Sequence, residues 1–443
     1  MTTARVSAAR VIERVEKERA FASAVLEAEL SRHVQLSARD RALATELVYG
    51  SLRVLPWLTS ELGRFAPRGV SDLDACVRAH LVVAAYQLLF TRVPPFAAVS
   101  EAVSAVRAAR GPRLASFANA VLRKVATRAR EMGEHDRASA IFASAPPWLS
   151  AALEGALTAE GSRAFLASGI EPPAVALRVE AAQDRDAWIE RLRAVAPDAR
   201  IEPGSVSPLA ILARGAGKPQ RLPGWTEGAW SIQDEGSQLA ALAVGAQAGE
   251  QVLDACAGRG NKTGLLARAV GPSGAVDVCD SIPAKLDRLR EELGRLRLGA
   301  RASFAVDWRA GSGEVTGLYD RILVDAPCSG VGTLRRRPEI GLRREQVDLA
   351  EMARGQMEIT SRVAAHLRPG GSLVYVVCSV LREEGEDVLA AVLRAHPLLE
   401  PAPFDVPEVR ALAQDAPTFR LLPHVHGTDG YFVARLRSRA PRL

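Results

Sequence analysis

The sequence is poor in the features that mark membrane-spanning, secreted or metal-binding proteins. Its longest apolar stretches, such as 81–90, fall well short of the roughly 20 residues that a bilayer span needs. The N-terminus carries Arg5 and Arg10, but no apolar signal core follows them. The 443 residues include five cysteines, none in a Cys-x-x-Cys pair, which argues against a disulfide framework or a zinc site. We therefore expect a soluble, cytoplasmic protein that binds no metal.

Positive charge is concentrated near the N-terminus. The net charge is +6, yet residues 1–130 hold 20 basic and 11 acidic residues, and the remainder of the chain is slightly acidic. A basic module joined to a near-neutral body is expected when the module recognises a polyanion, although a solvated basic surface has the same composition. At roughly 150 residues per domain, the length suggests two or three globular domains.

The N-terminal region has the pattern of a helical bundle. Apolar residues follow one helical stripe from Leu43 to Leu52, and Ser37 and Asp40 precede it at the spacing of a capping box. Proline and glycine separate the further helices that we predict over 76–90, 96–109 and 113–129. The last of these ends in a cationic turn suited to phosphate contacts, made of Arg123, Lys124, Arg128 and Arg130. We place an all-helical domain at 1–135.

The rest of the chain divides into a short mixed region and a longer α/β region. Residues 136–230 are interrupted by proline and glycine, and we predict a small α/β connector there, with a strand over 174–179. From 231 to 443, short apolar strands alternate with helices, which is typical of a doubly wound parallel sheet. The segments 419–425 and 431–436 read as a closing hairpin that supplies an antiparallel edge strand.

The first strand of the α/β region runs into a turn of small residues and then a helix. The turn reads Cys-Ala-Gly-Arg-Gly-Asn-Lys-Thr from Cys256, and such turns let backbone amides approach a ligand at the carboxyl end of a sheet. The glycine spacing of a phosphate loop or a dinucleotide fold is missing. A nucleoside ligand remains, with its ribose held by Asp280 after the second strand and Asp307 after the third. For either aspartate, a helix cap is the plain alternative.

Two cysteines lie at the carboxyl ends of predicted strands. Cys328 stands in Asp-Ala-Pro-Cys-Ser-Gly and Cys378 in Val-Tyr-Val-Val-Cys-Ser. Cys76 and Cys279 are better explained as inert buried residues. Five arginines between 335 and 344 follow Cys328, and we expect this cationic cluster to favour a thiolate there.

Together these motifs resemble the Nol/Nop/Sun family of RNA cytosine-5 methyltransferases, and within it the RsmB/Sun 16S rRNA group. The resemblance covers nearly the whole chain. It rests on Gln233-Asp234, the turn after Asp254, the two cysteine motifs, and Leu-Leu-Pro followed by Asp-Gly-Tyr-Phe-Val-Ala. In the helical part, Asp40 to Gly50, Tyr86-Gln-Leu-Leu-Phe and Asn119-Ala-Val-Leu-Arg look like a NusB-type RNA-binding domain.

The resemblance implies a fold, a cofactor and a set of site residues. The fold is a class I, Rossmann-like methyltransferase sheet preceded by an all-α NusB-like domain and the small α/β connector. Cys378 aligns with the nucleophile, Cys328 with the cysteine that assists product release, and Asp325 and Lys262 with groups that orient the base. S-adenosylmethionine is expected to bind Cys256, Ala257, Gly258, Arg259, Gly260, Asn261, Lys262, Asp280, Asp307 and Asp325.

The sequence departs from the family pattern at four positions. Where the family usually has Ala-Ala-Pro-Gly-Gly-Lys-Thr, the chain has Gly258, Arg259 and Asn261 in place of alanine, proline and the second glycine. Because asparagine tolerates a left-handed conformation, we expect the loop to survive, and we expect Arg259 to change cofactor affinity without abolishing it. Val377 stands where threonine usually precedes the nucleophile, which leaves the thiol in place.

The resemblance favours an enzyme that methylates carbon 5 of a cytosine in 16S rRNA, acting as a monomer. A tRNA cytosine-5 methyltransferase is the alternative substrate assignment, and only the NusB-like domain tips the choice toward rRNA. The alternative from another class is a non-catalytic RNA-binding factor in ribosome assembly. The arginine cluster at 335–344 is expected to contact RNA phosphate, with a solvated loop as the other interpretation.

Overall fold

A computed structural model describes residues 3–66, 69–70, 72–170 and 172–439. The chain forms two compact units. Unit 1 comprises residues 1–172 together with 334–344, and unit 2 comprises 173–333 and 345–443. Within the described ranges, no helix has the length and apolarity needed to cross a bilayer.

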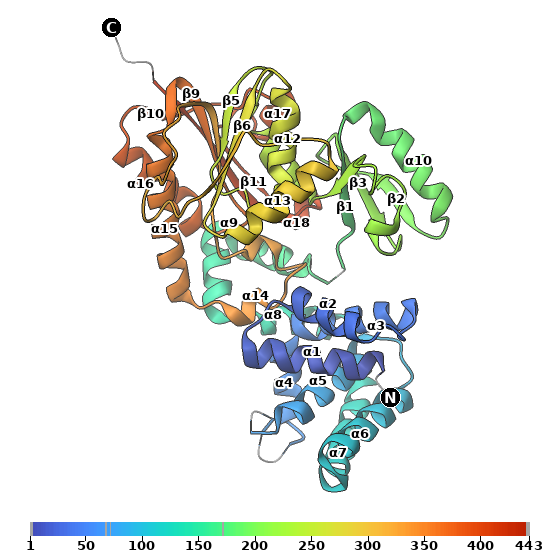
Figure 1. Ribbon diagram of the computed structural model, residues 1–443. Helices are drawn as coiled ribbons and strands as arrows, with labels where there is room; N and C mark the ends of the chain where they lie inside the picture. Colours follow the sequence, from blue (N-terminus) through green and yellow to red (C-terminus); the bar gives the residue numbers. More distant parts are fainter. Residues whose placement is uncertain (1–2, 67–68, 71, 171, 440–443) are drawn as a thin grey trace. The chain divides into compact units, whose positions relative to one another are not determined.

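Unit 1 is helical. Its helices are α1 (Ala4–Glu18), α2 (Ala22–Arg32), α3 (Ala38–Arg53), α4 (Leu55–Gly63), α5 (Ala75–Phe90), α6 (Pro95–Arg110), α7 (Pro112–Ala129), α8 (Glu134–Ser144), α9 (Pro147–Ala167) and α14 (Ile340–Arg343). The predicted helices over 76–90, 96–109 and 113–129 are therefore confirmed as α5, α6 and α7. Figure 1 draws the N-terminal helices α1 to α9 of unit 1 in blue to cyan-green and its later helix α14 in orange.

Local sequence explains where these helices begin. The Ser37 hydroxyl accepts a hydrogen bond from the Asp40 N–H at 3.1 Å, so Ser37 caps α3 as expected. Helices α6, α7 and α9 carry proline in the first turn. Proline lacks the backbone N–H, but the N–H groups of the first turn have no acceptor within the helix, so no hydrogen bond is lost. Helix α5 is buried over most of its surface and forms the centre of the apolar core that the other helices cover.

A segment from the C-terminal half of the sequence, residues 334–344, completes unit 1. The carboxylate of Glu339 is fully buried and accepts a hydrogen bond from the N–H of Ala22, the first residue of α2, at 3.2 Å. Arg53 donates to the carbonyl of Arg335 at 3.0 Å. The guanidinium of Arg343 lies 3.8 Å from the ring centre of Phe21. Residues far apart in sequence thus share one core.

Unit 2 begins with a small antiparallel sheet. Its strands are β1 (Val175–Val179), β2 (Arg200–Pro203), β3 (Ala210–Arg214) and β4 (Trp230–Ile232), in the order β2-β3-β1-β4, with α10 (Arg185–Val195) against it. This confirms the predicted strand over 174–179 within one residue. The predicted connector began at 136, whereas α8 and α9 group with unit 1 in the structure. Whether 1–135, 136–230 and 231–443 fold as separate domains stays a prediction.

The main sheet of unit 2 has eight strands. They are β5 (Gln251–Asp254), β6 (Ala275–Asp280), β7 (Ala302–Ala305), β8 (Tyr319–Asp325), β9 (Leu367–Val377), β10 (Leu399–Pro401), β11 (Thr418–Leu421) and β12 (Tyr431–Ser438). The order is β10-β12-β9-β8-β5-β6-β7, with β11 paired to β12. Strands β5 to β9 are parallel, so the predicted doubly wound sheet is confirmed.

Helices cover both faces of this sheet. Figure 1 shows α12 (Asn261–Val270) and α13 (Pro283–Arg295) on one face, and α15 (Gln346–Ala364) and α16 (Glu386–Ala395) on the other. Side chains alternate between the faces: Leu323 packs in the core beside α12, and its neighbours Ile322 and Val324 pack beside α15. Shorter helices are α11 (Glu235–Leu242), α17 (Pro407–Leu412) and α18 (Pro423–His426).

The closing hairpin is present, but its first strand is shorter than predicted. Strand β11 pairs with β12 in antiparallel register, with Leu421 opposite Tyr431. The chain then forms the short helix α18 at Pro423, because proline cannot donate the next ladder hydrogen bond. The predicted antiparallel edge is present: β9 pairs with one side of β12, and the antiparallel strands β10 and β11 pair with its other side and form the edge.

Candidate active site

Cys328 and Cys378 come together at the carboxyl end of the main sheet. Strands β8 and β9 are adjacent and parallel, with Asp325 opposite Val376, so the loops that follow them leave the same edge. The two sulfur atoms lie 3.2 Å apart and share a hydrogen bond, although the residues are 50 positions apart in sequence. Both residues are partly buried. The structure thus pairs the two cysteines that the sequence placed at strand ends.

The surroundings of Cys328 differ from the expected cationic environment. The hydrogen bond with Cys378, burial, and the charges of Cys378, Glu384 and Asp325 all raise the pKa of the Cys328 thiol. The prediction that arginines would favour a thiolate at Cys328 is therefore wrong. The hydrogen bond with Cys378 and burial contribute most to this rise, and the charges of Cys378, Glu384 and Asp325 add to it, because like charge disfavours a second anion.

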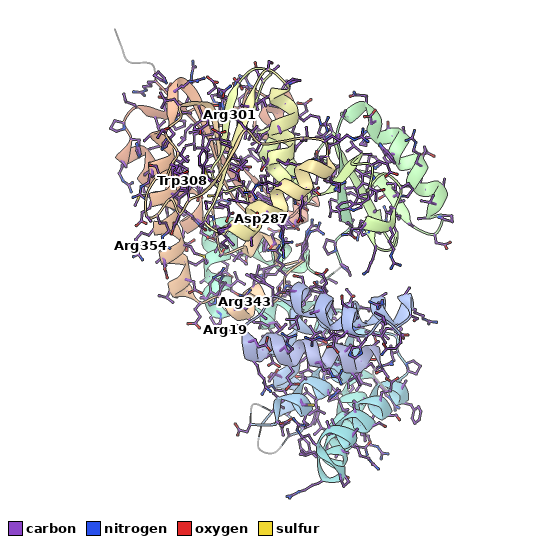
Figure 2. The ribbon with its side chains drawn as sticks, in the orientation of Figure 1. Arg19, Asp287, Arg301, Trp308, Arg343 and Arg354 are labelled. Carbon is purple, nitrogen blue, oxygen red and sulfur yellow. The ribbon has the colours of Figure 1, made fainter. Side chains whose placement is uncertain are left out.

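The five arginines of residues 334–344 belong to unit 1, where their backbone and side chains have partners. Burial, followed by repulsion from Arg344, lowers the pKa of Arg343, which is labelled in Figure 2. Arg337 is exposed. The expected contact between this cluster and RNA phosphate stays a prediction.

Lys262 and Asp325 form an ion pair at the same edge of the sheet. Lys262 stands in the first turn of α12, and its Nζ lies 2.6 Å from Oδ2 of Asp325 at the end of β8. Nζ also lies 5.8 Å from the ring centre of Tyr431. Burial alone would lower the pKa of Lys262, but the charge of Asp325 and its hydrogen bond outweigh burial and raise that pKa. Lys262 is thus held as a cation.

Three more carboxylates follow the neighbouring strands. Asp280, at the end of β6, accepts hydrogen bonds from the N–H of Gly258 at 3.1 Å and from the N–H of Ile282 at 2.9 Å. Asp307 is exposed, and the buried Trp308 next to it donates from its indole N–H to the carbonyl of Ala255 at 2.8 Å (Figure 2). Asp254 is buried at the end of β5. Asp280 and Asp307 therefore lie at the edge where the sequence predicted a ribose.

The turn after β5 owes its shape to two glycines. Gly258 and Gly260 have φ of +58° and +86°, a region that favours glycine, and a Cβ on Gly260 would lie 2.9 Å from Leu289. Asn261 begins α12 with ordinary helical backbone, so our reason for its tolerance was wrong: no left-handed conformation is needed there. Arg259 is exposed.

The residues of this edge suit S-adenosylmethionine. Above Gly258, a Cβ would meet open space, so a ligand has room against the turn. Asp280 and Asp307 offer carboxylates to ribose hydroxyls, and Ile282 is an apolar side chain 48% exposed directly beyond Asp280, suited to cover an adenine ring. Burial raises the pKa of Cys256 in the same turn, so it stays a thiol. The described residues hold no cluster of three potential metal ligands.

Sequence reasoning missed the carboxylate that joins the two cysteine loops. Glu384, six residues after Cys378, is fully buried. Its carboxylate accepts hydrogen bonds from the N–H of Ser329 at 2.7 Å, from the Ser329 hydroxyl at 2.5 Å and from the amide of Gln356 at 2.9 Å. The only signal in the sequence was an acidic pair closely following the second cysteine motif.

A second connection between the loops is made by backbone. The N–H of Gly332 donates to the carbonyl of Cys378 at 3.0 Å, and the N–H of Gly430 donates to the carbonyl of Gly332 at 2.7 Å. A Cβ on Gly332 would lie 2.0 Å from the carbonyl oxygen of Gly430. Only glycine fits this crossing.

In unit 1, the basic turn at the end of α7 is partly neutralised. Arg123, Lys124 and Arg130 are exposed, as a phosphate-binding face requires. Arg128 instead lies 3.8 Å from Glu61 and 3.6 Å from Glu131.

Comparison with known proteins gives matches to both halves of the chain. A family model described as 16S rRNA methyltransferase RsmB/F matches residues 241–437, and the NusB family model matches residues 2–127. The ribosomal RNA small subunit methyltransferase B of Erwinia tasmaniensis is 33% identical, covering 98% of this chain and 99% of that protein. The protein of the same name from Yersinia pseudotuberculosis is 33% identical, with 97% of each chain covered.

Solved structures share the fold. The crystal structure of PH0851 superimposes with a TM-score of 0.80 at 22% identity, covering 98% of this chain and 99% of the other. The structure of NSun6 from Pyrococcus horikoshii with SFG has a TM-score of 0.57 at 17% identity, covering 66% of this chain and 98% of the other.

Proposed function

The chain belongs to the RsmB family of ribosomal RNA small subunit methyltransferases, and from this premise we propose that it methylates carbon 5 of a cytosine in 16S rRNA. The observation that carries the proposal is the pair of thiols 3.2 Å apart at the carboxyl edge of the sheet. The reaction takes place in the cytoplasm, and the basic helical unit binds the RNA. S-adenosylmethionine, held by the turn at 256–262 with Asp280 and Asp307, supplies an electrophilic methyl group.

The chemistry explains why two thiols are needed. Carbon 5 of cytosine is a poor nucleophile, so the Cys378 thiolate first bonds to carbon 6, and the electron pair of the ring double bond shifts to carbon 5. Carbon 5 then takes the methyl group and still carries its hydrogen. A base removes that proton, the double bond re-forms, and Cys378 leaves as a thiolate.

Cys328 is suited to act as that base only after the adduct has formed. In the free protein, its hydrogen bond with Cys378 and the charge of Cys378 contribute to its raised pKa. Once Cys378 is bonded to carbon 6, its sulfur is uncharged and carries no thiol proton, so its contribution to the raised pKa of Cys328 is lost, while burial, Glu384 and Asp325 still raise that pKa. Cys328 then gives its proton to water. The Cys328 thiolate then accepts the proton from carbon 5 and ends as a thiol.

The ion pair between Lys262 and Asp325 serves the ring. Asp325 accepts a hydrogen bond from the cytosine amino group or from the protonated ring nitrogen, and the Lys262 cation stabilises charge that builds up during addition. Because the buried Lys262 already has its partner, neither group needs to reorganise when the base arrives. The ring must expose both faces, so the target cytosine is extruded from its stack.

Methyl transfer from labelled S-adenosylmethionine to unmodified 16S rRNA tests the proposal, with tRNA assayed in parallel. We expect C378A to lose transfer and C328A to accumulate a covalent protein–RNA adduct. C76A is the matched control, because Cys76 lies in α5 of unit 1, and it should keep wild-type activity. Transfer to tRNA alone would replace the substrate assignment. RNA binding without transfer to either RNA would favour a non-catalytic assembly factor.

A further inference from the structure

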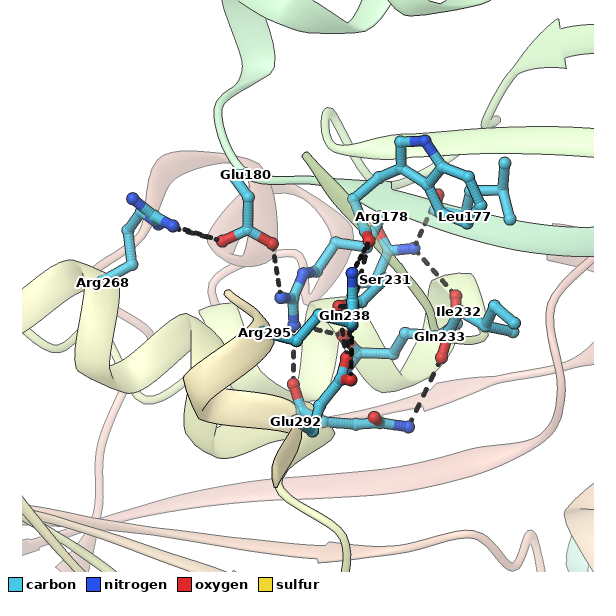
Figure 3. Close-up of polar contacts among 12 residues, drawn as sticks. Leu177, Arg178, Glu180, Ser231, Ile232, Gln233, Gln238, Arg268, Glu292 and Arg295 are labelled. Carbon is cyan, nitrogen blue, oxygen red and sulfur yellow. Dashed lines mark hydrogen bonds and ion pairs between the residues drawn. The ribbon is translucent and has the colours of Figure 1, made fainter. Parts of the chain in front are cut away.

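The small sheet of unit 2 places one arginine against the cofactor turn. Arg178, in β1, is fully buried. Its Nη1 donates to the carbonyl of Asn261 at 2.7 Å and to Oε1 of Gln233 at 2.8 Å, and its Nη2 donates to Glu180 at 2.8 Å (Figure 3). A buried guanidinium persists only when paired and hydrogen-bonded, so these partners hold it in one place.

The carbonyl that Arg178 holds belongs to Asn261, the first residue of α12, which lies within the expected cofactor turn at 256–262. Asn261 follows Gly260, where the backbone turns through φ of +86°, and precedes Lys262, which pairs with Asp325. Hydrogen bonds from a charged donor are about twice as strong as neutral ones, so this contact fixes the start of α12 more firmly than a backbone bond does. Gly264, one turn later, leaves room for the guanidinium: a Cβ there would lie 3.3 Å from Nη2.

Other contacts attach the small sheet to the helices of the main sheet without touching the loop. Glu180 also binds Arg268 of α12, with Nε at 2.9 Å. Arg295 of α13 donates to the carbonyls of Trp225 and Trp230 and lies 3.8 Å from the Trp225 ring centre (Figure 3 labels Arg178, Arg268 and Arg295). Arg295 therefore connects the small sheet to a helix of the main sheet, as Arg178 does, but it does so from the C-terminal end of α13.

We propose that Arg178 is a positioning residue for the cofactor, because it holds the Asn261 carbonyl and thereby fixes the turn at 256–262 in its binding conformation. The inference rests on the proposed use of S-adenosylmethionine. The turn has Arg259 and Asn261 in place of the proline and glycine usual in the family, so it lacks the stiffness that proline gives. The small sheet supplies the rigidity from outside the loop.

Calorimetric titration of S-adenosylmethionine without RNA tests this role, with thermal unfolding measured in parallel. We expect R178M to raise the Kd about tenfold, equivalent to about 1.4 kcal/mol, while kcat at saturating cofactor changes less than twofold. R178K keeps one donor and should recover part of the affinity. R295M is the matched control: its melting temperature should fall, with an unchanged Kd.

An unchanged Kd in a folded R178M protein would overturn the inference, as would an equal rise of Kd in R295M. If R178M does not fold, the Kd of R178K is compared with that of the wild type instead, and an unchanged Kd in R178K would overturn the inference. A wild-type protein that does not bind S-adenosylmethionine would overturn the proposed function and this inference together. Because RNA is absent from the titration, an error in the RNA substrate leaves the result unaffected.

Discussion

Asp254 should make the stability of unit 2 depend on pH. Its carboxyl is buried, and burial raises its pKa from 3.8 to about 7, against a hydrogen bond from Thr263 that lowers it. The folded protein therefore holds this proton up to higher pH than the unfolded chain does. Stability from this group is greatest below pH 4 and is lost as the pH rises to 7, by roughly 4 kcal/mol at 1.4 kcal/mol per pKa unit.

The substitution D254N removes this titration. An asparagine keeps an oxygen for Thr263 but places an amide where Oδ1 of Asp254 has no partner, at a pH-independent cost of about 1–3 kcal/mol. Between pH 4.5 and 8.5, the wild type should lose about 3 kcal/mol of unfolding free energy that D254N does not lose. The stability of D254N relative to wild type should therefore rise by that amount.

Urea denaturation at a series of pH values, followed by tryptophan fluorescence, measures this difference. The buried Trp308, whose indole donates to the carbonyl beside Asp254, reports on the same region. D287N is the control, because Asp287 is 66% exposed on α13 and should leave the pH dependence unchanged. Parallel curves for D254N and wild type would refute the reasoning.

Three further variants test the site. E384A leaves three buried donors without their acceptor, so its unfolding free energy should fall by roughly 3–5 kcal/mol while the exposed control D387N stays near wild type, as chemical denaturation will show. G332A forces a Cβ into backbone and should destabilise by about 3 kcal/mol, whereas G294A, in open space on α13, should not lower the melting temperature. For R259P, calorimetry should give a Kd for S-adenosylmethionine different from wild type; equal values would contradict our view of the loop.

The parts of the fold that follow from the sequence are those decided by local pattern. Helices α5, α6 and α7 are bounded by proline, glycine or a capping residue, and the parallel strands β5, β6, β8 and β9 each contain a short apolar run. The parallel sheet then brings its carboxyl ends to one edge, so the positions of Cys328 and Cys378 follow from the same pattern. The short strands β2 and β4 have too few residues to show an alternation.

The contacts that were missed join residues far apart in the chain. Glu384 is 55 residues from Ser329, and Arg178 is 83 residues from Asn261. The residue type alone does not indicate whether a charged side chain is buried. Its hydrogen-bonding partners are distant in sequence, so the neighbouring residues do not indicate it either. For the same reason, the arginines that follow Cys328 in sequence suggested a cationic site. In the structure, Cys328 lies beside Cys378 and near the carboxylate of Glu384, which both come from the loop after β9.

The membership of residues 334–344 in unit 1 has a consequence for synthesis of the chain. The N–H of Ala22 donates to the carboxylate of Glu339, which is 317 positions later in the chain. Arg53 donates to the carbonyl of Arg335, which is 282 positions later. At about 5–20 residues per second, a ribosome needs roughly 10–30 seconds after residue 172 to make this segment. During that interval the helical unit is exposed to the cell with Phe21 uncovered and the start of α2 uncapped by Glu339, so its final packing comes late in translation.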